Sequence, residues 1–65
     1  MIHKYYKLKN NNIPSVHLPK GAEYKPFGEV RFIPSIGWEA VGEVYIDRKL
    51  KQTEELRYEL WEAPK

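Results

Sequence analysis

The chain is short, weakly charged and free of cysteine: it has 65 residues, a formal net charge of +2 and two histidines. Disulfides are therefore excluded, and a structural zinc site is disfavoured because such sites draw on sets of Cys and His ligands. A domain of this size buries only about 60% of the surface that its unfolded chain exposes. We expect it to be stabilised by a dense core drawn from its nine aromatic residues, or by self-association or a partner.

Two further features concern location and charge. Residues 1–6 lack the apolar core of a secretory signal, and no apolar run approaches the length of a membrane span, which together with the missing cysteine predicts a cytoplasmic protein. Residues 1–25 sum to a charge of +4 and residues 26–65 to −2. A basic N-terminal region on a mildly acidic body suits an anionic partner, or simply favours solubility.

The first predicted element is a half-buried strand at residues 2–8, because its residues alternate in character. One face is formed by Ile2, Lys4, Tyr6 and Leu8, and the other by His3, Tyr5, Lys7 and Lys9. The three asparagines at 10–12 predict a turn after this strand.

A proline-containing loop is predicted at residues 9–26, since Pro14, Pro19 and Pro26 leave no room for a helix. A very short edge strand at 16–18 is compatible with these prolines. The loop is too apolar for a free linker, so we expect it to lie across the sheet and fill the core. Its apolar residues are Ile13, Val16, Leu18 and Tyr24.

An antiparallel pair of strands is predicted at residues 27–33 and 40–47, because both runs alternate and a Pro/Gly break separates them. Gly28 and Gly42 inside these strands predict a bulge or a close crossing of the backbone, as in a strongly bent sheet or small barrel. On the opposite, solvent-facing side, charged residues such as Arg31 are expected to pair across the strands.

The C-terminal tail fits two structures. A helix that begins near Thr53 gathers Leu56, Leu60 and Trp61 on one apolar side, and this is the structure we expect. A short helical turn followed by a strand through Arg57–Glu62 is the alternative, because apolar residues there also alternate.

The tail also carries a resemblance. Its pattern Asp47-Arg48-Lys49-Leu50, Thr53-Glu54-Glu55-Leu56 and Tyr58-Glu59-Leu60 is similar to the ends of small uncharacterised proteins from phages and mobile elements of Gram-positive bacteria. The resemblance covers residues 47–60 and implies a mobile-element origin, with no activity attached.

Nothing in the sequence has the spacing of a catalytic or metal site. Neither His3 nor His17 has an acidic residue within four positions, which is typical of surface histidines. The glutamates of the strand pair, Glu29, Glu39 and Glu43, have no accompanying nucleophile or metal ligands. We therefore predict a non-enzymatic protein that needs no cofactor or metal.

A basic and aromatic cluster offers one binding chemistry. An aromatic ring such as that of Tyr5 stacks on unpaired bases while lysines neutralise phosphates, which would make a single-stranded nucleic-acid-binding surface. The candidate residues are Lys4, Tyr5, Lys7, Lys9, Lys20 and Lys25. A solvated strand face with lysines that protect a sheet edge explains the same pattern.

Protein binding is the other chemistry, and tryptophan is its main indicator. Trp38 would mark an interaction surface if exposed and the scaffold if buried, whereas Trp61 is expected to be buried. The partner-binding candidates are Trp38, Ile13, Val16 and Tyr24.

These observations predict one α+β, mainly β domain spanning residues 1–65. It would hold a small twisted antiparallel sheet of three to four strands with a short C-terminal helix, or a small open barrel. The favoured function is a protein-interaction or inhibitor module, with self-association through a strand edge or the tail. Single-stranded nucleic-acid binding is the alternative.

Overall fold

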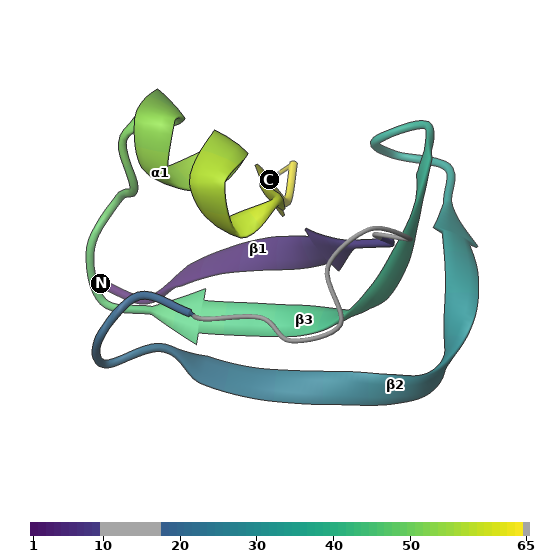
Figure 1. Ribbon diagram of the computed structural model, residues 1–65, viewed down its shortest axis with the longest axis horizontal. Helices are drawn as coiled ribbons and strands as arrows, with labels where there is room; N and C mark the ends of the chain where they lie inside the picture. The colour runs from purple at the N-terminus through teal and green to yellow at the C-terminus, as the bar shows by residue number, and fades with distance from the viewer. Residues whose placement is uncertain (10–17, 65) are drawn as a thin grey trace.

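One four-stranded antiparallel sheet with a short helix on one side forms the fold (Figure 1). The computed structural model describes residues 1–9 and 18–64. In chain order the elements are β1 (His3–Leu8), β2 (Glu23–Ile33), β3 (Trp38–Ile46), α1 (Gln52–Tyr58) and β4 (Leu60–Glu62). The strand order is β2-β3-β1-β4, so the sheet is open and the predicted mainly β class is confirmed.

The inner strand β1 buries the face that the nucleic-acid interpretation placed in solvent. Tyr5 is fully buried and Lys7 is 2% exposed, whereas Ile2 is 64% exposed. Expecting Tyr5 and Lys7 on a solvated face was therefore wrong. The physical reason is position: β1 lies between β3 and β4, and the segment around Leu50 covers its Tyr5 side.

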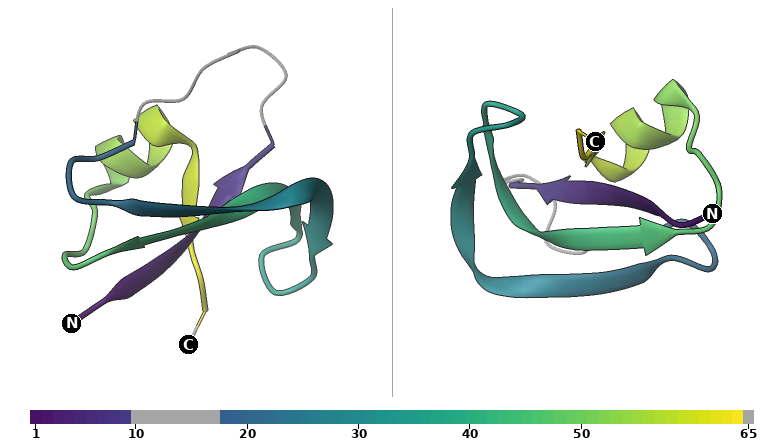
Figure 2. Two further views of the ribbon diagram at one scale, coloured as in Figure 1. Left: turned by 90° about the horizontal axis from the view of Figure 1, so that it is seen from below. Right: turned by 180° about the vertical axis from the view of Figure 1, so that it is seen from behind.

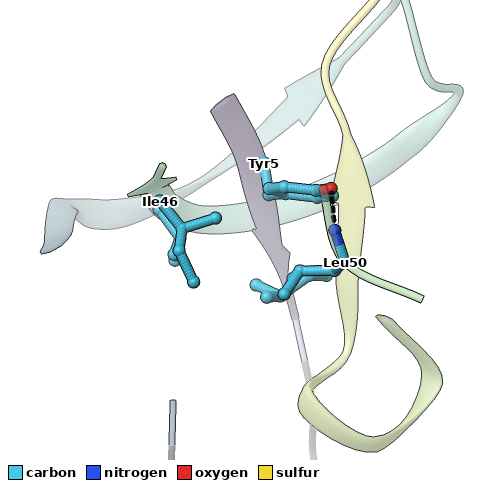
Figure 3. Close-up of a cluster of buried hydrophobic side chains, with 5 residues drawn as sticks. Tyr5, Ile46 and Leu50 are labelled. Atoms are coloured by element: carbon cyan, nitrogen blue, oxygen red, sulfur yellow. Dashed lines mark hydrogen bonds between the residues drawn. The ribbon is translucent and has the colours of Figure 1, made fainter. Parts of the chain in front are cut away.

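The core is built around Tyr5 (Figure 3). The buried members of this cluster are Tyr5, Val44, Ile46, Leu50 and Leu60, with Leu18, Ala22 and Tyr58 packed against them. The Leu50 N–H donates a hydrogen bond of 2.8 Å to the Tyr5 hydroxyl oxygen, so each of these polar groups has a partner inside the core. Burial raises the pKa of the Tyr5 hydroxyl above its ordinary value.

Strand β2 begins earlier than predicted, at Glu23 instead of residue 27, so the predicted loop at 9–26 is shorter. Tyr24 belongs to this strand and not to the loop, because it pairs with Val44. Alternate residues of an edge strand direct their backbone N–H and C=O groups away from the neighbouring strand. Pro26 is tolerated at such a position because its missing N–H breaks no hydrogen bond of the sheet.

Both glycine predictions are confirmed. The β2–β3 register shifts between Pro26 and Arg31, and Gly28 within this interval has a φ of +79°. At Gly42, a Cβ atom would lie 2.6 Å from the Tyr24 ring and 2.9 Å from the Pro26 Cα, so β2 crosses β3 too closely for any side chain there. The strand pair curls upward beyond the bulge (Figure 1).

Arg31 pairs along its own strand and not across strands as predicted. Its Nε atom donates to Glu29 Oε2 at 2.8 Å. Residues i and i+2 share one face of a strand, and both side chains are more than half exposed, so the pair forms in solvent beside the bulge.

The tail combines the two predicted structures: the short helix forms, and a strand follows it over Leu60–Glu62, not from Arg57. Helix α1 ends at Tyr58, and its C-cap Glu59 has left-handed backbone angles (φ 56°, ψ 52°). The Glu59 carbonyl oxygen accepts the Leu8 N–H at 2.9 Å. This bond joins the chain to β1, and β4 then pairs with β1 (Figure 2). A longer helix is thus replaced by a fourth strand, because β1 otherwise leaves its backbone groups unpaired.

Helix α1 begins at Gln52, which agrees with the predicted start near Thr53, and its N-cap is Lys51. The Glu54 carboxylate accepts the Lys51 N–H at 3.1 Å and is held by two Arg48 nitrogens at 3.0 and 2.8 Å. The hydrogen bond from Arg48 is the largest cause that lowers the pKa of Glu54 to about 2.

Two predicted core residues of the tail are exposed. Leu56 is 73% exposed and Trp61 is 51% exposed, whereas Leu60 is buried. Successive side chains of a strand point to opposite faces, so burying Leu60 in β4 turns Trp61 outward. The predictions made for residues 10–17, including the turn at 10–12, the contacts of Ile13 and Val16 and most of the short strand at 16–18, lie outside the described residues.

Candidate functional site

A groove beside β4 is a concave feature of the described surface. Its volume is about 730 Å³, and we call it the helix–strand groove. It is lined by Leu8, Lys9, Trp38, Gln52, Glu55, Leu56, Glu59, Leu60, Trp61 and Glu62. Helix α1 and the curled end of the β2–β3 pair rise on the same side of the sheet (Figures 1 and 2).

One face of α1 forms a wall of the helix–strand groove. Gln52, Glu55, Leu56 and Glu59 follow the i, i+3, i+4, i+7 spacing that places side chains on one side of a helix. The core takes up Tyr58, on another side of α1. The helix therefore uses one side for packing and presents another side to the groove.

Large apolar residues from three elements line this groove. Trp38 opens β3, Leu56 lies on α1 and Trp61 lies on β4, and all three are more than half exposed. Small cores normally recruit every large apolar residue available. Interfaces, in contrast, concentrate tryptophan at the centre of contact. Trp38 is thus exposed, and exposure was the condition for interpreting it as an interaction residue.

The charges around the helix–strand groove are mainly acidic. Glu55, Glu59 and Glu62 line it together with one cation, Lys9, whose Nζ lies 3.9 Å from Glu39 Oε1. Glu62 Oε2 lies 3.8 Å from His3 Nδ1. Among the described residues, no ion pair within 4.0 Å involves Glu55. The groove therefore presents negative charge next to its apolar side chains.

A buried lysine holds one of these carboxylates in place. Lys7 Nζ donates to the Leu8 carbonyl oxygen at 3.2 Å and to Glu59 Oε2 at 3.5 Å. Lys7 is 2% exposed, so its ammonium needs this anionic neighbour. The contact links the interior of the sheet to the rim of the groove, at the C-cap residue of α1.

The backbone of β4 offers an unpaired edge. The Leu8 N–H donates to Glu59 O and the Ala63 N–H donates to Lys4 O, both at 2.9 Å. In an antiparallel ladder the bonded residues alternate, so Trp61 also faces β1, whereas Leu60 and Glu62 direct their N–H and C=O groups away from it. Since β4 is an outer strand of the described sheet, these groups face its outer edge, and the accessible ones belong to Glu62 because Leu60 is 3% exposed.

The nucleic-acid candidates do not form one basic patch. Tyr5 and Lys7 are buried, and Lys9 is beside Glu39. Lys4 Nζ contacts Glu43 Oε2 at 2.8 Å, and this hydrogen bond raises the pKa of Lys4 and lowers that of Glu43.

The two remaining lysines, Lys20 and Lys25, are exposed. Lys25 Nζ lies 5.1 Å from the centre of the Tyr45 ring. The set of six candidates is thus divided among the core, neutralised pairs and separate surface positions.

The partner-binding candidates are also divided. Trp38 lines the helix–strand groove, Tyr24 is 40% exposed on β2 outside it, and Ile13 and Val16 lie outside the described residues. Sequence reasoning missed Leu56, Trp61 and the acidic rim. The positions of Glu55, Glu59 and Glu62 are visible in the sequence. That they line one groove follows only from the end of α1 before Glu59 and the start of β4 at Leu60.

Comparison with known proteins adds no relative: no family model, curated protein or solved structure matches this chain. Within residues 1–9 and 18–64, no three His, Asp or Glu side chains gather as ligands of a metal ion would. In the same part of the chain, no helix has the length and apolar character that crossing a bilayer requires.

Proposed function

We propose that this protein is a non-enzymatic interaction module that binds another protein through the helix–strand groove. The observation that carries the proposal is the gathering of Trp38, Leu56 and Trp61, each more than half exposed, around one concavity. A single exposed apolar residue is ordinary, but three large ones from three elements form a surface of the kind that partners cover. An inhibitor that occupies its target in this way is one form of such a module.

The groove also has the two parts that a specific interface needs. Its apolar side chains supply contact area, and its carboxylates form a polar rim that selects among partners. The basic residues of the nucleic-acid interpretation are separated, so no arrangement in the described residues favours that function. The mobile-element origin remains a prediction that rests on the tail pattern alone.

The test is selection of peptides from a displayed random library on the wild-type protein. We expect the enriched peptides to bind Leu56→Glu at least about tenfold more weakly, because a charge replaces an exposed apolar contact. Phe32→Ser is the matched control: Phe32 is 61% exposed on β2 and does not line the groove, so binding should be unchanged. Far-UV circular dichroism checks that both variants fold.

Equal binding to wild type and Leu56→Glu would contradict the proposal, as would loss of binding in Phe32→Ser alone. A mixed single-stranded oligonucleotide is the second probe. Tight, salt-sensitive binding of that oligonucleotide, unaffected by Leu56→Glu, would replace the proposal with the nucleic-acid function.

A further inference from the structure

We infer that the helix–strand groove takes an extended segment of a partner protein, which adds to β4 as a further strand and carries basic residues at every second position. This inference rests on the proposed function, because it names the partner segment for the same groove. Three independent features of the described residues lead to it: the free backbone edge, the acidic rim and the alternation of side chains along β4.

The backbone edge decides the form of the segment. Glu62, which is half-buried, presents an N–H and a C=O group away from β1 and lines the groove. The backbone groups of Leu60 face the same way, but Leu60 is 3% exposed, so pairing with an added strand centres on Glu62. A helix has no free backbone groups with which to meet this edge, whereas an extended chain meets it in register. The edge of β4 is short, so an added strand gains further contact from the α1 wall beside it.

The acidic rim decides the charge of the segment. Glu55 and Glu62 line the groove, and Lys9 is already beside Glu39. Glu59 adds a third carboxylate, although Lys7 offsets part of its charge. Lysine or arginine in the partner would complement these groups. Their aliphatic stems would cover Leu56 while their charged ends reached the carboxylates.

The alternation of side chains along β4 predicts the spacing of the basic residues in the partner segment. Leu60 and Glu62 pair with Lys7 and Tyr5, whose side chains point into the core side of the sheet, and Trp61 pairs with Tyr6 on the opposite face. An added strand alternates in the same way. Its basic residues would therefore face Glu62 and α1 at every second position, and the residues between them would be apolar where they pass Trp61.

The same features disfavour a second copy of this chain as the occupant. Pairing two β4 strands about a two-fold axis would place each acidic rim against an identical one. Like charges brought together in this way weaken association. The favoured occupant is a different protein, and it supplies the cations.

A defined peptide tests the inference. The probe is a synthetic peptide of about seven residues that alternates lysine and valine, compared with a peptide of the same composition in which the lysines form one block. Both tryptophans of the chain line the groove, so their fluorescence reports binding directly. We expect the alternating peptide to bind at least about threefold more tightly than the blocked one.

Backbone methylation isolates strand addition from simple charge attraction. Two versions of the alternating peptide carry N-methyl groups on alternate amides, one version in each of the two possible phases. Methyl groups that face β4 remove hydrogen bonds, so we expect one version to lose about tenfold or more in affinity and the other to keep it. Equal affinity of the two versions would overturn the inference.

Charge variants complete the test. The double variant Glu55→Gln with Glu62→Gln should weaken binding of the alternating peptide by about three- to tenfold. The control is Glu23→Gln with Glu29→Gln, which removes two exposed carboxylates from β2 and should leave binding unchanged. If the control weakens binding equally, the peptide responds only to net charge and the inference fails.

Failure here is distinguishable from failure of the proposed function. Selected peptides that depend on Leu56 but lack alternating basic residues, or that tolerate both methylated phases, would reject the extended basic segment and leave the interaction module standing. Selected peptides indifferent to Leu56 would reject both. A concentration-dependent dimer that is lost in Leu56→Glu would show the second copy to be the occupant and would overturn the inference.

Discussion

The two outer strands of the sheet, β2 and β4, differ in length, in exposure and in the regularity of their edges. β2 has 11 residues and is exposed along nearly all of them, yet it carries Pro26, a bulge around Gly28 and several charged side chains. β4 has three residues, with no proline or bulge and one charged side chain, that of Glu62, and α1 stands beside it. Proline, bulges and charge are the usual means by which proteins protect an edge from further pairing.

The exposed edge of β2 and the edge of β4 that we propose binds a partner therefore differ in regularity. β2 is open to solvent but has an interrupted register, so it offers little regular backbone to a partner. β4 is short but regular, and the helix–strand groove places side-chain contacts next to its free backbone groups. Variants in and beneath the two edges test this difference.

Removing the anchor of β4 should have the largest effect. Leu60 is 3% exposed in the core, so Leu60→Ala should lower the free energy of unfolding by about 2–4 kcal/mol through lost burial and the resulting cavity. Phe32→Ala on β2 is the control, since Phe32 is 61% exposed and its loss should change stability by about 0.5 kcal/mol or less. Urea titration followed by circular dichroism measures both, and equal losses would contradict the comparison.

Removing the buried hydrogen bond between Tyr5 and Leu50 should have an intermediate effect on the free energy of unfolding. Tyr5→Phe removes the acceptor of the buried Leu50 N–H and should cost about 1–2 kcal/mol at neutral pH. The matched control is Tyr24→Phe, because Tyr24 is 40% exposed on β2 and should lose almost nothing. The same urea titration compares them.

The pH dependence of stability gives Tyr5 a second signature. Burial raises the pKa of the Tyr5 hydroxyl above its ordinary value of 10.0, so the folded state favours the neutral form. The stabilisation is complete below that ordinary value and is lost as the pH rises through the folded pKa. The alkaline fall in unfolding free energy should therefore be shallower in Tyr5→Phe than in wild type, and parallel curves would contradict this.

Restoring the missing N–H group of Pro26 on β2 should have the smallest effect on the free energy of unfolding. It should nevertheless make the β2 edge more prone to pair with another chain. Pro26→Thr supplies a donor at the free edge and is expected to change the free energy of unfolding by less than about 1 kcal/mol. Self-association should increase with protein concentration, because the edge regains a regular ladder. Sedimentation velocity measures it, and a variant that stays as monomeric as wild type would show that Pro26 does not protect this edge.

Local signals in the sequence predicted much of the sheet. The alternation at 27–33 and 40–47 predicted β2 and β3, and the two glycines predicted the bulge and the close crossing. The buried face of β1 was not predictable in this way, because alternation defines two faces without saying which one is covered. That choice depends on Leu50, which is 45 residues away from its hydrogen-bond partner Tyr5.

The groove was less accessible to sequence reasoning. Trp38 was identified as an interaction candidate, but Trp61 was expected in the core because the preferred helix would have turned it inward. The left-handed backbone of Glu59 ends that helix, and glutamate is a residue that rarely signals such an ending. Once the chain turns there, Leu60 stays buried in β4 and Trp61 turns outward.

The position of β1 between β3 and β4 has a consequence for the order of folding. β2 and β3 are joined by a tight turn and can pair early, whereas β1 must wait for partners far along the chain, with Lys7 and Glu59 separated by 52 positions. We expect amides of β2 and β3 to gain protection before those of β4 in pulse-labelling hydrogen exchange, and the reverse order would contradict this. During synthesis, the strand made first would then remain unpaired until β3 emerged, and the edge proposed to bind a partner would be the last part of the sheet to form.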